Sequence, residues 1–221
     1  MSYLNTLIGV LLIAVGLFEG GWVVLAIWLG GDFLVLGIAH AVGAHGVFGK
    51  RPDGSLPLWS WVAFLPLLIN TYVIWHLIQL FSREAVKHAV TDQLVVGRRL
   101  LASELDEDFD NYVDLTAEFS EPRAIRRCAA YRSFPILDAG APTPAALAEE
   151  VACLRPGKTF IHCAQGHGRT GLFALAILLK SGKARTPEEG LRMLQKARRG
   201  IRLNRAQRRC VEAFAQNLAV K

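Results

Sequence analysis

The sequence predicts an α/β fold with a central, mostly parallel sheet flanked by helices, preceded by an all-α transmembrane segment. Residues 1–81 are largely apolar and almost free of charge, whereas short apolar runs alternate with amphipathic stretches beyond residue 94. Such alternation of strands and helices is typical of a parallel sheet. A Gly-rich loop between apolar runs at 159–161 and 172–179 adds the strand–loop–helix turn expected in such a sheet.

The distribution of charge divides the chain at the same place. Residues 1–81 hold two basic and three acidic side chains, whereas residues 82–221 hold 23 basic and 16 acidic ones. The overall charge of +6 therefore belongs to the second part. We expect a hydrophobic membrane module at 1–81, a connector at 82–93 and a soluble domain of ordinary size at 94–221.

Three apolar runs, at 4–18, 22–47 and 56–81, are the candidates for membrane helices. A spanning helix needs about 20 apolar residues, so the third run qualifies, the second qualifies if it accommodates Asp32, and the first is at the lower limit. A signal peptide is the alternative for the first run, but no basic segment precedes the apolar stretch. Two or three spans fit this pattern, with three preferred, and the first two runs can also form a re-entrant hairpin.

Basic residues close to the end of the third run place the soluble domain in the cytoplasm by the positive-inside rule. A single span before them would put Lys50 and Arg51 on the outer side, which opposes the rule. Four cysteines without disulfide or metal-ligand spacing agree with a reducing compartment. We therefore expect an integral protein of the inner or plasma membrane whose soluble domain faces the cytoplasm.

The spacing of apolar residues along the chain and the positions of turn-forming residues predict the strands and helices of the soluble domain. Strands are predicted at 94–97, 112–115, 131–136 and 159–161, and helices at 142–154, 172–180, 187–198 and 205–218. Thr186 and Asn204 are the expected N-caps of the last two helices. The spacing of His40, His45 and His76 in the hydrophobic part indicates packed or interfacial side chains rather than a metal site.

The most informative stretch runs from residue 160 to residue 171 and reads FIHCAQGHGRTG. Glycines let the loop after Cys163 curl with its N–H groups inward, and the following helix directs its positive dipole end at the same point. Such a cradle fits a tetrahedral oxyanion such as phosphate. The expected phosphate ligands are Ala164, Gln165, Gly166, His167 and Gly168 together with Arg169.

Each residue type in this stretch suits phosphoryl transfer. Converging N–H dipoles and Arg169 favour the thiolate of Cys163, which becomes an activated nucleophile. The planar guanidinium of Arg169 can bind two phosphoryl oxygens at once. Thr170 can donate its hydroxyl hydrogen to the sulfur when Cys163 leaves, and His162 can hold the loop by bonding to backbone carbonyls.

This stretch resembles the Cys-x5-Arg signature of the protein-tyrosine phosphatase superfamily. Its form, His-Cys-x-x-Gly-x-Gly-Arg-Thr-Gly, is similar to that of the dual-specificity branch, including the phosphatase-and-tensin type. The resemblance covers about residues 90–218 and says nothing about residues 1–81. It implies a cysteine-based phosphatase that works through a phosphocysteine intermediate, without a cofactor or a metal.

Transfer from an alcohol or a phenol also requires an acid for the leaving oxygen. Asp138 is the candidate, because it follows a predicted strand and precedes small residues that allow movement. Asp114 is the second candidate, although its strand pattern indicates that it faces a neighbour. The segment 200–207 resembles the loop that positions the hydrolytic water in tyrosine phosphatases, which implies that role for Gln207; a surface residue is the alternative.

The expected function is that of a membrane-anchored phosphoric monoester hydrolase, a dual-specificity phosphatase for phosphotyrosine, phosphoserine and phosphothreonine. The alternatives are a phospholipid phosphatase, of phosphatidylglycerophosphate or phosphoinositide type, and a catalytically weak phosphate-binding module. The membrane module and the basic segment 191–210 favour lipid, whereas Ala164 and Gln165 replace basic residues often seen in lipid-directed relatives. The expected partners are a phosphorylated protein or phospholipid and the membrane, without nucleic acid; the oligomeric state stays open.

Overall fold

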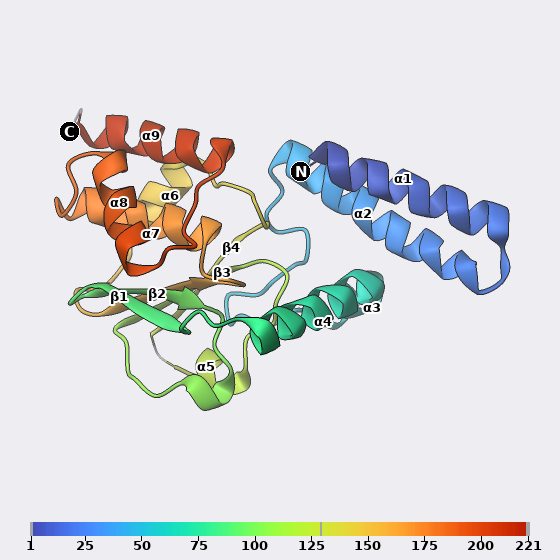
Figure 1. Ribbon diagram of the computed structural model, residues 1–221, viewed down its shortest axis with the longest axis horizontal. Helices are drawn as coiled ribbons and strands as arrows, with labels where there is room; N and C mark the ends of the chain where they lie inside the picture. The colour runs from blue at the N-terminus through green and yellow to red at the C-terminus, as the bar shows by residue number, and fades with distance from the viewer. Residues whose placement is uncertain (1, 129, 220–221) are drawn as a thin grey trace.

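The structure, a computed structural model, describes residues 2–128 and 130–219 and has a helical part and a sheet domain (Figure 1). In the helical part, α1 and α2 lie side by side as a hairpin and extend away from the sheet domain. A short 3-10 turn, Gly21–Val24, joins them. The four helices of this part are α1 (Ser2–Glu19), α2 (Leu25–Val42), α3 (Leu58–Ala63) and α4 (Leu65–Phe81).

The sheet domain is built on five strands in the order β1-β2-β5-β3-β4. Only β1 is antiparallel to its neighbour, and the other neighbouring strands are parallel, so the predicted mostly parallel sheet is confirmed. The strands are β1 (Lys87–Thr91), β2 (Leu94–Arg98), β3 (Asn111–Thr116), β4 (Tyr131–Ile136) and β5 (Thr159–Cys163). The helices are α5 (Arg123–Arg126), α6 (Pro144–Ala152), α7 (Gly168–Lys180), α8 (Pro187–Ala197) and α9 (Arg205–Ala219).

Successive side chains of a strand point to opposite faces of the sheet, and both faces are covered by other elements. The helices α6 to α9 lie on one face, where Val113, Ile161 and Cys163 pack against the buried side of α7. The short helix α5 and the long loops cover the other face, where Tyr112 and Phe160 pack. The central strands are therefore buried on both sides, as parallel strands usually are.

The predicted strands and helices of the soluble domain are all present, with ends that shift by a few residues. The prediction missed β1, which was assigned to the connector at 82–93. Lys87 and His88 gave this stretch a charged pattern, and an edge strand tolerates such residues. Since β1 pairs with β2, the sheet domain already begins inside the predicted connector.

The third apolar run is not one long helix, because it divides at Phe64 into α3 and α4. By length and composition, Ser2–Glu19 and Gly21–Val42 could cross a membrane, whereas Leu65–Phe81 is shorter. Instead, α4 packs on the sheet domain through Tyr72 and Trp75, whose rings contact Phe119. The third predicted span is thus a helix attached to the sheet domain along part of its length.

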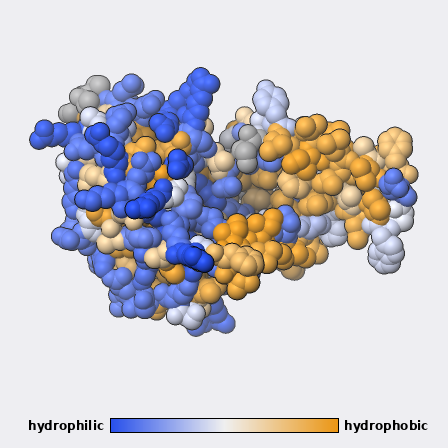
Figure 2. Space-filling view, in the orientation of Figure 1, coloured by the Kyte–Doolittle hydropathy of each residue, from blue (hydrophilic) through white to orange (hydrophobic). Residues whose placement is uncertain are grey.

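Close backbone contact holds α1 and α2 together. A Cβ atom added to Gly9 would lie 2.7 Å from the carbonyl oxygen of Gly30, and one added to Gly30 would lie 2.8 Å from that of Gly9. Toward the two ends of the hairpin, Cβ atoms added to Gly16 and Gly37 would lie 3.1 Å from the carbonyl oxygen of Val23 and 3.2 Å from that of Ser2. Small residues at such an interface are typical of helices that pack inside a membrane. The outer surface of the hairpin is predominantly apolar (Figure 2).

Lys50 overturns one expectation, because it does not lie on the far side of a membrane from the sheet domain. Its Nζ lies 2.5 Å from Oδ2 of Asp114 in β3, and also donates to the carbonyl oxygen of Thr116 at 2.7 Å. A helix that crossed a bilayer between Lys50 and Arg83 would separate these partners. Within the described residues, α1 and α2 are the two helices long and apolar enough to be candidate spans, and the number of spans stays a prediction.

Candidate active site

The predicted strand–loop–helix is formed as expected, with β5 ending at Cys163 and α7 beginning at Gly168. Gly166 has a φ of 73° and a Cβ there would lie 2.3 Å from the carbonyl oxygen of Gly97 in β2. Only glycine fits this position. The loop therefore curls tightly over the end of the sheet, with the N-terminus of α7 directed at the buried Cys163.

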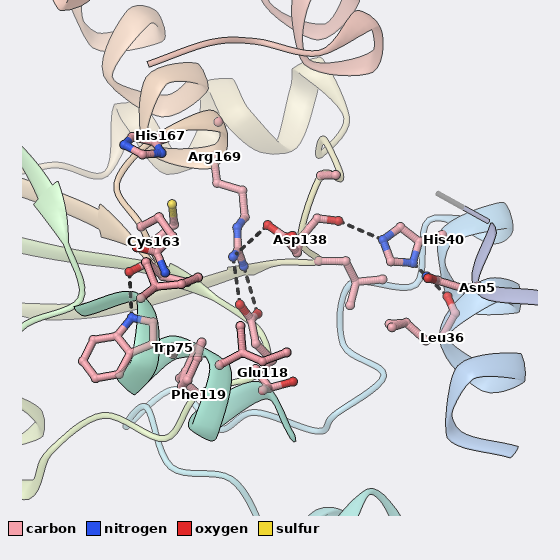
Figure 3. Close-up of a pocket in the computed structure, with 18 of the residues that line it drawn as sticks. Asn5, Leu36, His40, Trp75, Glu118, Phe119, Asp138, Cys163, His167 and Arg169 are labelled. Carbon is pink, nitrogen blue, oxygen red and sulfur yellow. Dashed lines mark hydrogen bonds and ion pairs between the residues drawn. The ribbon is translucent and has the colours of Figure 1, made fainter. Parts of the chain in front are cut away.

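Arg169 enters the site from the first turn of α7 and is 2% exposed. Its two terminal nitrogens pair with both carboxylate oxygens of Glu118 at 2.9 and 2.8 Å, and Nη2 lies 3.1 Å from Oδ1 of Asp138 (Figure 3). Burial alone lowers the pKa of Arg169, but the carboxylates outweigh it and raise that pKa above its ordinary value. The Nε atom has no hydrogen-bond partner among the described residues, which leaves it for a ligand oxygen.

Glu118 is a site residue that the sequence analysis missed. It lies just after the carboxyl end of β3, the strand next to β5, and it also accepts a hydrogen bond from the N–H of Ala117. Ligand sites of parallel sheets gather at this edge. An acidic residue three positions beyond the predicted strand at 112–115 was therefore the signal that could have identified it.

The two candidate acids have very different surroundings. The side chain of Asp138 is 73% exposed and faces the site from the loop after β4. Asp114 is fully buried and accepts hydrogen bonds from Lys50 and from the hydroxyl of Tyr131 at 2.7 Å. Asp114 therefore faces neighbouring side chains, and of the two candidate acids only Asp138 lines the cavity beside Cys163.

His162 and Thr170 lie in the predicted stretch, and both side chains are buried. Neither ring nitrogen of His162 has a hydrogen-bond partner of good geometry in the described chain, and Nε2 lies 3.8 Å from Oδ1 of Asp114. Strand alternation explains this, because His162 and Cys163 point to opposite faces of the sheet. The role of His162 in holding the loop stays a prediction, because a hydrogen bond with the backbone of Cys163 acts to raise the pKa of the ring, against the larger effect of burial. The buried hydroxyl of Thr170 is also without a partner among the described residues and stays a proposed donor.

The loop is held from outside by α4 and by Arg198. The indole N–H of Trp75 donates to the carbonyl oxygen of Ala164 at 2.9 Å, and Gln79 donates to the side chain of Gln165 at 3.1 Å. Arg198 donates to the carbonyl oxygen of Gln165 at 2.9 Å and is 2% exposed. Arg198 therefore supports the loop from a buried position and is not one of the exposed basic residues of the segment 191–210.

Gln207 also reaches the loop and is not a surface residue. It is 2% exposed, accepts a hydrogen bond from the N–H of Asn204 at 3.1 Å, and donates to the carbonyl oxygen of Gly140 at 3.1 Å. A Cβ added to Gly168 would lie 3.1 Å from Oε1 of Gln207. The side chain therefore lies against the start of α7, where a water could be oriented.

These residues surround a cavity of about 550 Å³. Cys163, Arg169 and Asp138 lie at its polar end, together with Gln207 and the exposed Arg202. Helices α2 and α4 form another wall with apolar side chains, beside the polar His40, Asn70 and Thr71; Figure 3 shows Leu36 and His40 of α2 and Trp75 of α4 around the cavity. The apolar wall residues are Leu36, Leu67, Ile74 and Ile78. The hydrophobic part of the chain is therefore part of the candidate site and not only an attachment to it.

A second polar cluster lies on the other face of the sheet. Asp114, Glu121 and His162 each offer one potential metal ligand, and these atoms lie within 4.8 Å of one another. Lys50 already neutralises Asp114, and Arg99 pairs with Glu121 at 2.7 Å. Two cations of the chain thus occupy the positions that a metal ion would need, so we assign no metal to this cluster.

The sheet domain has the fold of the protein-tyrosine and dual-specificity phosphatases. No protein-family model and no curated protein matches the sequence. Among solved structures, the chain is similar to Tk-PTP in its active form, with 24% identity and a TM-score of 0.54 over 59% of this chain and 97% of that chain. The structure of PTPMT1 in complex with PI(5)P has 18% identity and a TM-score of 0.54 over 62% of this chain and 98% of that chain. The structure of human DUSP28 has 16% identity and a TM-score of 0.55 over 62% of this chain and 97% of that chain.

Proposed function

We propose that the protein is a membrane-bound, cysteine-dependent phosphatase that hydrolyses the phosphomonoester of a phospholipid headgroup. The observation that carries this proposal is the cavity, which joins the Cys163 loop to an apolar wall from α2 and α4. In this proposal the α1–α2 hairpin of the module at 1–81 inserts in the membrane. The sheet domain then faces the cytoplasm, where reducing conditions keep Cys163 free.

The first half-reaction forms a bond between Sγ of Cys163 and phosphorus. The bond from phosphorus to the headgroup oxygen breaks, and Asp138 gives its proton to that oxygen, so a neutral alcohol leaves. Arg169 and the loop N–H groups bind the three remaining phosphoryl oxygens as their charge is redistributed. The fixed pairing of Arg169 with Glu118 holds the guanidinium in place for this contact.

The second half-reaction returns the enzyme to its starting state. Water attacks phosphorus while Asp138, now a carboxylate, takes one of its protons, and the sulfur–phosphorus bond breaks to release inorganic phosphate. Gln207 is positioned against the start of α7 to orient that water. Thr170 is the proposed hydroxyl donor to the departing thiolate.

The apolar wall favours a lipid over a phosphorylated protein. Ile74 and Ile78 are 47% and 43% exposed and lie one turn apart on α4, so they present one face to the cavity. Apolar surface also continues over α4 and the hairpin (Figure 2). A lipid can bury its glycerol and acyl carbons on such a wall, while Arg202 supplies a basic side chain that Ala164 and Gln165 do not.

A phosphate-release panel tests this proposal. The protein in detergent is compared on a phospholipid with a terminal phosphomonoester, in mixed micelles, and on peptides that carry phosphotyrosine, phosphoserine or phosphothreonine. We expect faster release from the lipid and loss of all release in Cys163→Ser. Preference for peptides would instead establish the dual-specificity protein phosphatase predicted from the sequence, and no release by the wild type would favour a binding module.

A substitution in the wall separates lipid binding from chemistry. Ile78→Asn should lower kcat/KM for the micellar lipid and leave a small aryl phosphate unaffected. Leu77→Asn is the matched control, because Leu77 is similarly exposed on α4 but does not line the cavity. Equal effects of the two substitutions on lipid turnover would count against the proposed wall.

A further inference from the structure

We propose that the hydrophobic part of the chain supplies two positioning residues, His40 and His45, which hold the loop that carries Asp138 in its working position. This inference rests on the proposed function, because it takes Asp138 as the general acid. It assigns the helical part a role in the reaction beyond attachment to a membrane. The argument starts from the loop at 137–141, which follows β4.

The backbone of this loop is strained next to the acid. Ala139 has a φ of 57° and is the only non-glycine residue with a positive φ in the described ranges 2–128 and 130–219. An L-residue in this left-handed region costs about 1–2 kcal/mol. Such a conformation persists only where surrounding contacts fix it. The contacts around the loop therefore determine where Asp138 points.

His40 contacts the loop from the last turn of α2. Its Nε2 lies 2.9 Å from the carbonyl oxygen of Asp138 itself, and its Nδ1 lies 2.8 Å from that of Leu36 (Figure 3). Both partners are carbonyl oxygens, which only accept, so Nε2 donates to Asp138 when it carries the proton of the neutral ring, and a doubly protonated ring donates to both. The hydrophobic helix is thus bonded directly to the backbone of the acid.

His45 spans the loop from one end to the other. The N–H of Leu137 donates to Nδ1 at 3.2 Å, and Nε2 lies 3.0 Å from the carbonyl oxygen of Ala141. Since Nδ1 accepts, the proton of the neutral ring lies on Nε2 and is donated to Ala141. Burial lowers the pKa of His45, which favours this neutral ring. A Cβ added to Gly140 would lie 3.0 Å from Cε1, so the loop also packs on the ring.

The sheet domain supplies the remaining bonds to the loop. The side chain of Asn204 donates to the carbonyl oxygen of Ala139 at 2.7 Å, and Gln207 donates to that of Gly140 at 3.1 Å. The carbonyl groups of four successive residues, 138 to 141, are therefore all bonded, the inner two to the sheet domain and the outer two to the hydrophobic part. The outer two bonds come from the hydrophobic part, so the sheet domain alone does not fix both ends of the loop.

Leaving-group dependence tests whether the two histidines act through Asp138. His40→Ala and His45→Ala should lower kcat on phenyl phosphate about tenfold or more, because phenolate needs protonation. An aryl phosphate with a strongly acidic phenol should lose little rate. His40→Gln should recover much of the loss, since its amide can donate to Asp138. His76→Ala is the control, because His76 is exposed on α4 and contacts only Trp75 among the interactions described.

Combination with Asp138→Asn gives the second readout. If the histidines only position the acid, neither alanine substitution should lower kcat further once Asp138 cannot donate. Equal loss on both classes of aryl phosphate, or full additivity with Asp138→Asn, would overturn the proposal and indicate a general effect on the fold.

Hydrogen exchange keeps the proposal testable even if the wild type releases no phosphate. Amides at 137–141 should exchange faster in His45→Ala than in the wild type or in His76→Ala, because Leu137 loses its acceptor. Unchanged exchange would overturn the positioning role. Absence of turnover with the expected exchange difference would instead refute the proposed function alone.

Discussion

Lys50 and Asp114 form a buried ion pair between the hydrophobic part and the central sheet. Both side chains are at most 1% exposed, and Lys50 also contacts the hydroxyl of Thr116 at 2.9 Å. Burial alone raises the pKa of Asp114, but the ammonium of Lys50 outweighs it and lowers that pKa below its ordinary value. The pair fixes the segment after α2, and with it His45, against the sheet domain.

Removal of the ammonium should destabilise the protein strongly. Lys50→Met leaves the Asp114 carboxylate buried without its cation, which typically costs about 3–5 kcal/mol. Unfolding by heat or denaturant in detergent micelles measures this. Arg51→Met is the control, because Arg51 is exposed and its substitution should change stability by less than about 0.5 kcal/mol. Similar small effects of both substitutions would contradict the ion pair.

The contact between α1 and α2 should depend on individual glycines. Gly30→Leu places a side chain against the backbone of Gly9, so the helices must separate and the midpoint of thermal unfolding in detergent should fall. Gly31→Leu is a matched control, because a Cβ there meets no atom within 4 Å. An equal fall for both variants would show that the hairpin is not packed in this way.

Glu118 should matter for turnover through Arg169. Glu118→Gln replaces one acceptor oxygen with an N–H group that faces the guanidinium, so Arg169 is displaced and kcat falls, by up to about 10²-fold. Initial rates on a small aryl phosphate provide the measurement. Glu149→Gln, on the exposed face of α6, should leave kcat unchanged. Wild-type kcat in Glu118→Gln would remove the positioning role of Glu118.

His162 should make the fold sensitive to acid. Burial lowers its pKa to about 4 from an ordinary 6.5, so below pH 6.5 the unfolded chain binds a proton that the folded protein does not bind. Stability therefore falls as the pH drops from 6.5 to about 4, by up to about 3 kcal/mol. The His162→Gln variant should show a shallower decline when unfolding is followed across this range.

Glu121 acts in the opposite direction in the same range and is present in both proteins. Burial and the nearby Asp114 raise its pKa to about 7, so the folded state holds a proton there that the unfolded chain releases. The difference between wild type and His162→Gln isolates the histidine. Parallel stability curves for the two proteins would contradict the prediction.

The phosphate loop could be predicted from the sequence because its parts are contiguous. Cys163, the glycines and Arg169 lie within one strand–loop–helix, so local rules determine their geometry. The alternating strands and helices likewise predicted the sheet. The pattern of apolar residues failed at β1, where charged residues concealed an edge strand.

Contacts between distant parts of the chain could not be predicted in this way. Glu118 reaches Arg169, Lys50 reaches Asp114, and His40 reaches Asp138 across long sequence separations. The pattern of residues along the chain does not show which residue of a helix in the hydrophobic part lies beside which residue of a loop in the sheet domain. The apolar run at 56–81 also satisfied the length of a membrane span, although α4 forms a wall of the site.

The phosphoryl group itself provides the most direct test of the central claim, which is that Cys163 takes it from a lipid. Wild-type protein is mixed with a phospholipid phosphomonoester in micelles, denatured rapidly during turnover, and the peptide that contains Cys163 is analysed by mass spectrometry. We predict a phosphoryl group on Cys163 in the wild type and none in Cys163→Ser. Release of phosphate from the lipid with Cys163 unmodified at every time point, or equal release by Cys163→Ser, would contradict the account.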